Sequence, residues 1–287
     1  MTFADFCKAH GLLVSSVELG RWIRVATTDH PKTKNGAYKW LGDVGFVQNH
    51  ATMTDVAVWR PDATAQPVDM TAIHAKVAEH ERKQRAGWAR AAESAAELIR
   101  TAAQAEHGYL QIKGFPDAKG LVLPDDALLV PMRHLRTNAL VGAQVIRWLP
   151  EERKYEKKML PGMRAKGAVF RLGSAQAPRT WLVEGYATAL SVECALRMLK
   201  MRDSVLICFS AGNLIHVASE IGGGAVVFAD NDESGAGERA AKATGLRYCM
   251  AGTTGHDAND MHQHLGIFKV ASLMVDAINS AIPEPVS

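Results

Sequence analysis

The feature of this sequence that most constrains its fold is an alternation of apolar and amphipathic segments between about residues 179 and 280. Short apolar runs, WLV, VLICF and AVVFA, are separated by YATALSVECALRML, GNLIHVASEI and GERAAKATG, in which apolar residues recur at helical spacing. Strands that are apolar on both faces are typical of parallel sheets buried between helices. The pattern therefore predicts an α/β fold with a parallel sheet flanked by helices.

Acidic residues follow these predicted strands at or near their carboxyl ends: Glu184 after WLV, Asp230 and Asp232 after AVVFA, and Asp257 and Asp260 after LRYCMA. Functional groups of open α/β sheets gather at this edge. Residues two apart in extended backbone point the same way, so Asp230 and Asp232 can converge on one ion. Clustered carboxylates without cysteine suit Mg²⁺ or Mn²⁺, and such a cation relieves their mutual repulsion. The sequence predicts a divalent metal site here.

A structural interpretation of the same acids stands beside the functional one. A single aspartate at a strand end commonly caps the next helix, and an isolated Asp-x-Asp pair is a weak signal. The combination of Glu184-Gly185, Asp230-x-Asp232 and a third acidic loop is more specific and favours function. The ESGAG segment after Asp232 is expected to supply flexible backbone and a helix start that phosphate oxygens can approach.

Residues 1–68 are predicted to form a small β-rich unit. The segments RWIRVAT, GAYKWLG and GFVQNHA alternate apolar and polar residues and are separated by turn residues. The aromatic side chains of Trp22, Tyr38, Trp40 and Trp59 are expected to form a compact core or a stacking surface.

Three further segments complete the predicted organisation. Residues 69–106 are rich in Ala, Glu, Lys and Arg and predict a helical linker of one long helix or two in succession. Residues 107–172 are expected to form a mixed α+β basic subdomain, in which HGYLQIKGF, LVLPDDALLVPMRH and NALVGAQVIRWL are paired strands. Residues 173–287 hold the α/β domain.

The most basic stretch of the chain is RKYEKKMLPGMRAKGAVFR, just before the α/β domain. Such a run is usually a solvated face, yet like charges repel one another, and the stretch can equally hold a phosphate backbone. The net charge of +3 neither demands nor excludes nucleic acid.

Cysteine usage and hydropathy indicate a cytoplasmic protein without a membrane partner. The four cysteines are scattered with no C-x-x-C pair, so no zinc ribbon is readable and the thiols are expected to be reduced. The N-terminus lacks a signal-peptide pattern, and no apolar run reaches the ~20 residues of a membrane helix.

The segments VEGYATALSV, FADNDESGAGERAA and GHDANDMH together resemble the TOPRIM domain of bacterial-type primases, type IA and II topoisomerases and some nucleases. Upstream, HGYLQIKGF, LLVPMRHLRTNALVGAQVI and KKMLPGMRAKGAVFRLG are similar to the catalytic core of bacterial replicative primases. The resemblance covers about residues 107–265 and is closest to small primases of phages, plasmids and other mobile elements.

The chain departs from that family in two places. HPKTKNGAYKWLGDVGFVQNH is laid out like the zinc ribbon of those primases but lacks the cysteine ligands, so no zinc is expected. Asn259 stands where the primase pattern often has a second acid, so either Asp260 substitutes for it or that metal position is weaker.

The resemblance implies a DNA primase that makes short RNA primers on single-stranded DNA from nucleoside triphosphates. It implies Glu184, Asp230 and Asp232 as catalytic residues that bind Mg²⁺ or Mn²⁺, with Asp257 and Asp260 as further ligands. The implied contacts to nucleic acid and nucleotide are Arg133, Arg147, Lys154, Lys157, Lys158, Arg164 and Lys166. The chain has no G-x-x-x-x-G-K-[ST] phosphate loop, so a separate replicative helicase is an expected partner.

Two alternatives remain open. A TOPRIM-type nuclease uses the same acids and ions to direct water, although the basic upstream segment favours polymerisation. A non-catalytic DNA-binding replication accessory protein is disfavoured because acids at a DNA site repel phosphate. A topoisomerase needs an active-site tyrosine in a separate gate module, and none of the five tyrosines lies in one.

Overall fold

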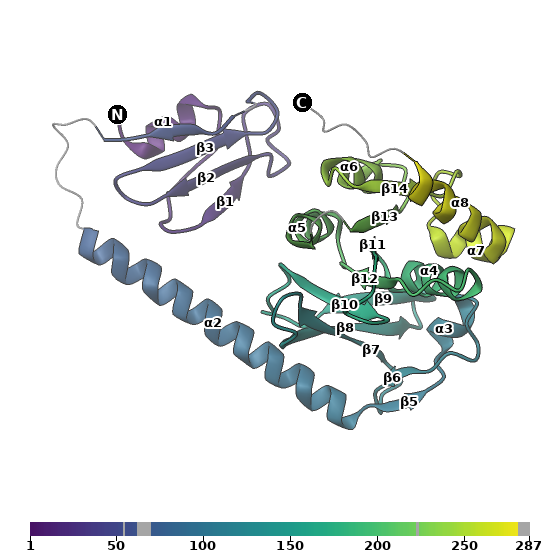
Figure 1. The fold of residues 1–287 in the computed structure, drawn as a ribbon. Helices are drawn as coiled ribbons and strands as arrows, with labels where there is room; N and C mark the ends of the chain where they lie inside the picture. The colour runs from purple at the N-terminus through teal and green to yellow at the C-terminus, as the bar shows by residue number, and fades with distance from the viewer. Residues whose placement is uncertain (54, 62–69, 222–223, 281–287) are drawn as a thin grey trace. The chain divides into compact units, whose positions relative to one another are not determined.

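The computed structural model describes residues 1–53, 55–61, 70–221 and 224–280 (Figure 1). The chain divides into two compact units, Met1–Ala86 and Gly87–Ser287. The domain boundaries predicted after residues 68, 106 and 172 remain predictions.

The first unit is a four-stranded antiparallel sheet with a short helix, and the three strands predicted there are confirmed. Helix α1 (Phe3–Ala9) begins after Thr2, whose hydroxyl accepts a hydrogen bond from the Asp5 N–H. The strands are β1 (Trp22–Val25), β2 (Gly36–Trp40), β3 (Gly45–Asn49) and β4 (Ala57–Trp59), paired in that order.

The aromatic residues of the first unit separate onto the two faces of this sheet. Tyr38 and Trp59 are buried with Phe3, and Trp40 packs against them. Trp22 is 48% exposed, and its ring lies 6.4 Å from that of Phe46. The predicted aromatic core is therefore confirmed, and the stacking surface remains a prediction for which Trp22 is the exposed candidate.

Helix α2 (Met70–Thr101) is one continuous helix and ends five residues before the predicted limit of the helical linker. Residues Ala103–Ala105 form strand β5, which pairs with β6 (Gly120–Val122). Within the second unit, Ala95 is buried with Leu98 and Ile99 packed nearby, so the end of α2 belongs to a hydrophobic core.

The prediction of a strand for HGYLQIKGF was wrong, because this segment contains helix α3 (Gly108–Ile112). The His107 imidazole accepts a hydrogen bond from the Tyr109 N–H at 3.1 Å and so caps the helix. The other two segments predicted as strands are confirmed and pair antiparallel: LVLPDDALLVPMRH overlaps β6 and contains β7 (Leu128–His134), and NALVGAQVIRWL contains β8 (Leu140–Leu149). The basic stretch after them, for which no strand was predicted, forms β9 (Lys154–Met159) and β10 (Ala168–Leu172).

The predicted α/β class, with a parallel sheet flanked by helices, is confirmed in the second unit. Its four parallel strands lie in the order β14-β13-β11-β12, and β10 joins them antiparallel to β12. These strands are β11 (Thr180–Val183), β12 (Ser204–Ile207), β13 (Ala225–Ala229) and β14 (Arg247–Met250).

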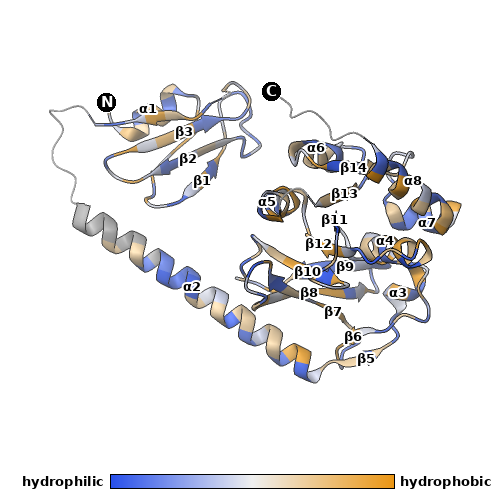
Figure 2. Cartoon of the chain, in the orientation of Figure 1, coloured by the Kyte–Doolittle hydropathy of each residue, from blue (hydrophilic) through white to orange (hydrophobic). Residues whose placement is uncertain are grey.

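Helices cover both faces of the parallel strands (Figure 1). One face, with Trp181 and Phe228, packs against α4 (Tyr186–Met198), α7 (Ala258–Leu265) and α8 (Ile267–Asn279). The other face, with Leu182 and Val227, packs against α5 (Ala211–Ile221) and α6 (Ala236–Ala243). Figure 2 shows the apolar character of the strands between these helices. Strands buried on both faces are what their unbroken apolar runs predict.

The structure bears on the cysteines and on the hydropathy of the helices. All four cysteines are present as free thiols, and burial raises the pKa of Cys7 to about 12. Across the described ranges, every helix is too short or too polar to cross a membrane.

Candidate acidic site and its basic surroundings

Glu184 and Asp230 lie side by side at the carboxyl edge of the parallel sheet. Each is the first residue after its strand, β11 and β13, and these strands are direct parallel neighbours. Adjacent strands are about 4.8 Å apart, so the two backbones leave the sheet close together. This pairing brings the backbones of Glu184 and Asp230 together, whereas the convergence of Asp230 and Asp232 on one ion remains a prediction.

Both carboxyl groups hold their protons more tightly than exposed acids do. Burial, followed by the charges of Asp257 and Glu184, raises the pKa of Asp230 to about 7. Burial and the charge of Asp232 also raise the pKa of Glu184. The Oδ1 atom of Asp230 is buried without a hydrogen-bond partner in the described part of the chain. An unpaired buried acceptor is unfavourable, so this oxygen is a strong candidate for a bound cation.

Asp232 is engaged with the start of helix α6. Its carboxylate accepts hydrogen bonds from the Gly237 N–H at 2.8 Å, the Ala236 N–H at 3.2 Å and the Ser234 hydroxyl. These bonds lower the pKa of Asp232, the Ser234 contact most of all. The N–H groups that ESGAG was expected to offer to phosphate are therefore already occupied by Asp232.

Gly237, the last residue of the ESGAG segment, is required because two backbone segments approach each other closely there. A Cβ atom at Gly237 would lie 2.2 Å from the carbonyl oxygen of Asp230, a distance that no side chain tolerates. Glycine thus lets the first turn of α6 pack directly against the backbone of the acidic edge.

Asp257 and Asp260 form the capping box of helix α7, so part of the segment predicted as a loop is helical. The Asp257 carboxylate accepts hydrogen bonds from Thr188 Oγ1 at 3.0 Å and from the N–H groups of Asn259 and Asp260. Asp260 in turn accepts the Asp257 N–H at 3.1 Å. Capping engages both acids, as the structural interpretation of a strand-end aspartate anticipates.

Asn259 points away from the acidic edge into the protein. It is fully buried, and its Nδ2 donates to the carbonyl of Lys113 at 2.8 Å and to Ser191 Oγ at 3.1 Å. The residue that departs from the primase pattern therefore braces helix α7 against neighbouring segments.

The side chains at this edge fit a hard divalent cation that takes only a few of its ligands from the protein. Within the described ranges, no three His, Cys, Asp or Glu side chains are grouped closely enough to hold a metal ion by themselves. Mg²⁺ at nucleotide sites, however, is usually bound through one or two carboxylates, with water and phosphate completing its octahedron. Glu184 and Asp230 can provide such a pair.

Lys157 is the cation that the fold brings to these acids. Its charge opposes the upward pKa shifts of both Glu184 and Asp230, which places its ammonium group in their field. The same ammonium lies 5.4 Å from the centre of the Tyr109 ring. The neighbouring Lys158 points to the opposite face of β9 and pairs with Glu156 at 2.8 Å.

Two further predicted phosphate contacts lie on the Lys158 face. The pairing of β8 with β9 places Arg147 opposite Glu156 and Leu149 opposite Lys154. Arg147 and Lys154 therefore lie on the same sheet face as Lys158, away from Lys157. Arg147 forms an ion pair with Asp125 at 2.8 Å, and Lys154 pairs with Glu152 at 2.5 Å. The fold does not bring these side chains to the acidic edge.

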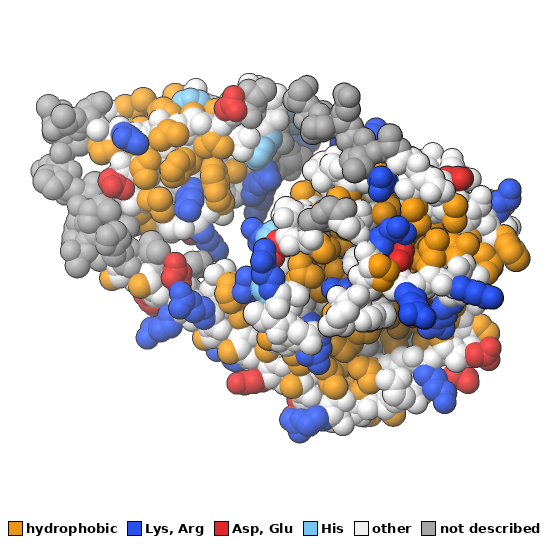
Figure 3. Space-filling view, in the orientation of Figure 1, with side chains coloured by type: hydrophobic (Ala, Val, Ile, Leu, Met, Phe, Trp, Pro, Cys, Tyr) orange, Lys and Arg blue, Asp and Glu red, His pale blue; other side chains and the backbone are white. Residues whose placement is uncertain are grey.

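The remaining predicted cations differ in how they are engaged. Arg133 donates to the carbonyl of Asn138 at 2.9 Å, and the Arg164 guanidinium lies over the Trp88 ring at 5.3 Å. Lys166 is exposed and has no hydrogen-bond or ion-pair partner in the described part of the chain. On the face seen in Figure 3, Lys and Arg side chains form several separate groups among apolar and uncharged atoms.

Tyr109 is a residue of this site that sequence reasoning missed. Its side chain is 1% exposed, its hydroxyl is buried without a partner in the described part of the chain, and burial raises its pKa to about 12. Its position two residues after His107, the cap of helix α3, could have indicated a helix start, but the segment HGYL was predicted as a strand.

Tyr109→Phe is expected to leave the free energy of unfolding unchanged or raise it by about 1 kcal/mol, because the hydroxyl forfeits hydration without gaining a bond. The matched control is Tyr38→Phe. The Tyr38 hydroxyl accepts a hydrogen bond from the Glu18 N–H at 3.1 Å, so this variant should lose about 1 kcal/mol of its free energy of unfolding. Urea denaturation measures both. A clear loss of stability in Tyr109→Phe would show that this hydroxyl is bonded.

Comparisons with known proteins do not assign this chain to a family. No family model matches the chain, and no curated protein matches it. A solved structure titled "Structure of the DnaG catalytic core" aligns with 74% of this chain and 74% of its own, at 14% sequence identity and a TM-score of 0.39. A similarity of this size is too low to assign a family or an activity.

Proposed function

We propose that this chain is a DNA primase that synthesises short RNA primers on single-stranded DNA by divalent-metal-dependent nucleotidyl transfer. The observation that carries the proposal is the acidic pair Glu184 and Asp230 at one sheet edge, with Lys157 in the same electrostatic field. The resemblance of the surrounding motifs to primase cores, from about residue 107 to 265, points to the same chemistry.

In this proposal Glu184 and Asp230 hold Mg²⁺ or Mn²⁺ at the carboxyl edge. The ion supplies neutralisation of the triphosphate and orientation of the primer 3′-hydroxyl for in-line attack on the α-phosphate. The buried Oδ1 of Asp230 is the ligand oxygen that gains most from a cation. Asp232 and Asp257 add negative charge while capping helices, and Asp260 completes the cap of α7.

Lys157 has a distinct part in the same proposal. Its ammonium balances the two carboxylates and lies over an aromatic ring, so it is held near the place where a nucleotide phosphate would sit. Lys166, without a protein partner among the described residues, is the second candidate for a phosphate contact.

The single-stranded template would also meet the exposed sheet face of the first unit. Direct cross-strand pairing places Trp22 beside Lys39 and Lys39 beside Phe46. Aromatic rings interleaved with cations are the chemistry that binds single strands through stacking and phosphate contacts.

Trp22→Ala is expected to weaken single-stranded DNA binding by about 1–3 kcal/mol, or roughly 5- to 150-fold, if one base stacks on this ring. Fluorescence anisotropy with a labelled oligonucleotide measures the change. Phe268→Ala removes an aromatic ring that is 76% exposed on α8 and should leave binding unchanged. Equal affinities for the Trp22 variant and the wild type would exclude the stacking role.

Location in the cytoplasm, a separate replicative helicase and an origin in a phage, plasmid or other mobile element belong to the same proposal. A TOPRIM-type nuclease is the second candidate, because the same carboxylates can direct water. Incubation with a single-stranded template, labelled nucleoside triphosphates and Mg²⁺ or Mn²⁺ separates the two. New short oligonucleotides support the primase, degradation of the template without synthesis supports the nuclease, and neither product would indicate a binding protein.

A further inference from the structure

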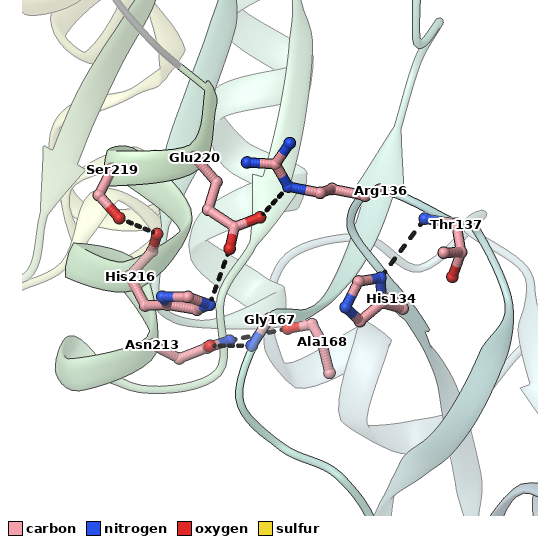
Figure 4. Close-up of polar contacts among 9 residues, drawn as sticks. All are labelled: His134, Arg136, Thr137, Gly167, Ala168, Asn213, His216, Ser219 and Glu220. Atoms are coloured by element: carbon pink, nitrogen blue, oxygen red, sulfur yellow. Dashed lines mark hydrogen bonds and ion pairs between the residues drawn. The ribbon is translucent and has the colours of Figure 1, made fainter.

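A side-chain amide on helix α5 joins the start of β10 to the end of β12. Asn213 Oδ1 accepts a hydrogen bond from the Gly167 N–H at 2.8 Å, and Nδ2 donates to the carbonyl of Ala168 at 2.8 Å (Figure 4). The same Nδ2 donates to the carbonyl of Cys208, also at 2.8 Å. One side chain therefore makes three hydrogen bonds to backbone groups of two different segments.

The two segments joined by this amide lead to the acidic edge. After β12, the Phe209 N–H donates to the carbonyl oxygen of Glu184 at 3.0 Å. Because β10 runs antiparallel to β12, its first residues lie beside this strand end. Lys166 directly precedes Gly167, and β10 is separated from β11, which ends before Glu184, by the single strand β12. Asn213 thus fixes the backbone next to Lys166 relative to the backbone of Glu184.

Gly167 occupies a conformation and a space that restrict this connection. Its φ is +74°, and a Cβ atom there would lie 3.5 Å from Nε2 of His216 and 3.7 Å from Nε2 of His134. The backbone passes between two imidazoles, as Figure 4 shows. The Asn213 bond to the Gly167 N–H holds this passage.

We propose that Asn213 is a positioning residue for a phosphate contact made by Lys166. The inference rests on the proposed function, because it takes nucleic acid as the ligand of this edge. In the same basic segment, Arg164 lies over Trp88 and Lys158 pairs with Glu156, whereas Lys166 has no partner in the part of the chain described. An exposed lysine contacts phosphate productively when its backbone is held in place, since less freedom is given up on binding.

The test is the salt dependence of single-stranded DNA binding by the full chain. A plot of log K against log salt concentration has a slope that falls by about 0.7 for each phosphate of a single strand that the protein ceases to neutralise. Lys166→Ala and Asn213→Ala are each expected to lower the slope by about 0.7, and the double variant to lower it no further. Non-additivity is the readout that a purely structural role of Asn213 would not produce.

Glu220→Gln is the matched control. Glu220 lies on α5 with Asn213, accepts a hydrogen bond from Arg136 and lies 3.3 Å from Nε2 of His216, without a hydrogen bond to Gly167 (Figure 4). This variant should keep the wild-type slope. If circular dichroism shows that Asn213→Ala is unfolded, Gly167→Ala takes its place. Alanine is strained at the φ of +74° found there, so this variant is expected to displace the same backbone.

Three results would overturn the inference while the proposed function stands: a wild-type slope for Asn213→Ala, a wild-type slope for Lys166→Ala, or a double variant lower by about 1.4. A wild-type protein that does not bind single-stranded DNA would instead overturn the proposed function, and the inference with it. The two failures are therefore distinguished by the wild-type measurement alone.

Discussion

Asp230→Asn is expected to be more stable than the wild type at about pH 8 without divalent cations, while losing nucleotidyl transfer by a factor of about 10³ or more. Asp230 has a pKa of about 7 in the folded chain, against 3.8 for an ordinary aspartate. The folded state therefore binds a proton that the unfolded state has released. The contribution of Asp230 to stability falls as the pH rises from about 4 to about 7 and stays at its lowest above that window.

Denaturation of both proteins between about pH 4 and pH 9, in the presence of a chelator, measures this effect. The difference between the two curves isolates Asp230 from other titrating groups and should reach a few kcal/mol in favour of the variant. A variant that is less stable than the wild type at about pH 8 would assign Asp230 a structural hydrogen bond instead.

Asp232→Asn is the matched control, with the opposite sign. Hydrogen bonds from Ser234 and the start of α6 lower the pKa of Asp232, so its carboxylate stabilises the folded chain above the pKa of the unfolded state. This stabilisation is lost only as the pH falls through the lowered pKa. The Asp232 variant should therefore be less stable than the wild type at neutral pH.

Added Mg²⁺ should raise the unfolding temperature of the wild type and leave that of Asp230→Asn nearly unchanged, because a ligand stabilises only the folded state that binds it. An equal increase for both proteins would place the ion elsewhere.

Lys157→Met is expected to lower turnover about 100-fold, as removal of one cation aimed at reacting phosphate does in comparable sites. The change also removes the charge that opposes the upward pKa shifts of Glu184 and Asp230. The acidic limb of the pH–rate profile should therefore move to higher pH in the variant. Steady-state primer synthesis across pH measures both effects.

Lys158→Met is the control for this pair of neighbouring lysines. Lys158 lies on the opposite face of β9 and pairs with Glu156, so its replacement should change turnover less than about threefold. Equal losses in both variants would mean that the strand presents its charge to nucleic acid without regard to face.

The parallel sheet could be predicted from the sequence because its strands are apolar on both faces, which leaves few alternatives for WLV or AVVFA. The placement of Glu184 and Asp230 followed from the same pattern, since parallel neighbours end at one edge. Helix α3 could not be predicted in this way, because five residues are too short to show helical periodicity and the His107 cap is a local hydrogen bond.

The distribution of the basic residues was beyond the sequence for a different reason. Lys157 and Lys158 are adjacent and chemically identical, and only the pairing of β9 with β8 decides which of them faces the acids. Likewise, Asp232 and Asp257 resemble Asp230 in sequence, but the helices that follow engage them as caps. Pattern locates a group of candidates, whereas tertiary contacts assign each member its partner.

Template-directed synthesis by the wild type beside Asp230→Asn tests the central claim most directly. The proteins would be incubated with single-stranded DNA, labelled nucleoside triphosphates and Mg²⁺ or Mn²⁺, with circular dichroism confirming that both are folded. The account predicts short, template-dependent oligonucleotides from the wild type alone. Equal synthesis by both proteins, or template degradation without synthesis by the wild type, would contradict it.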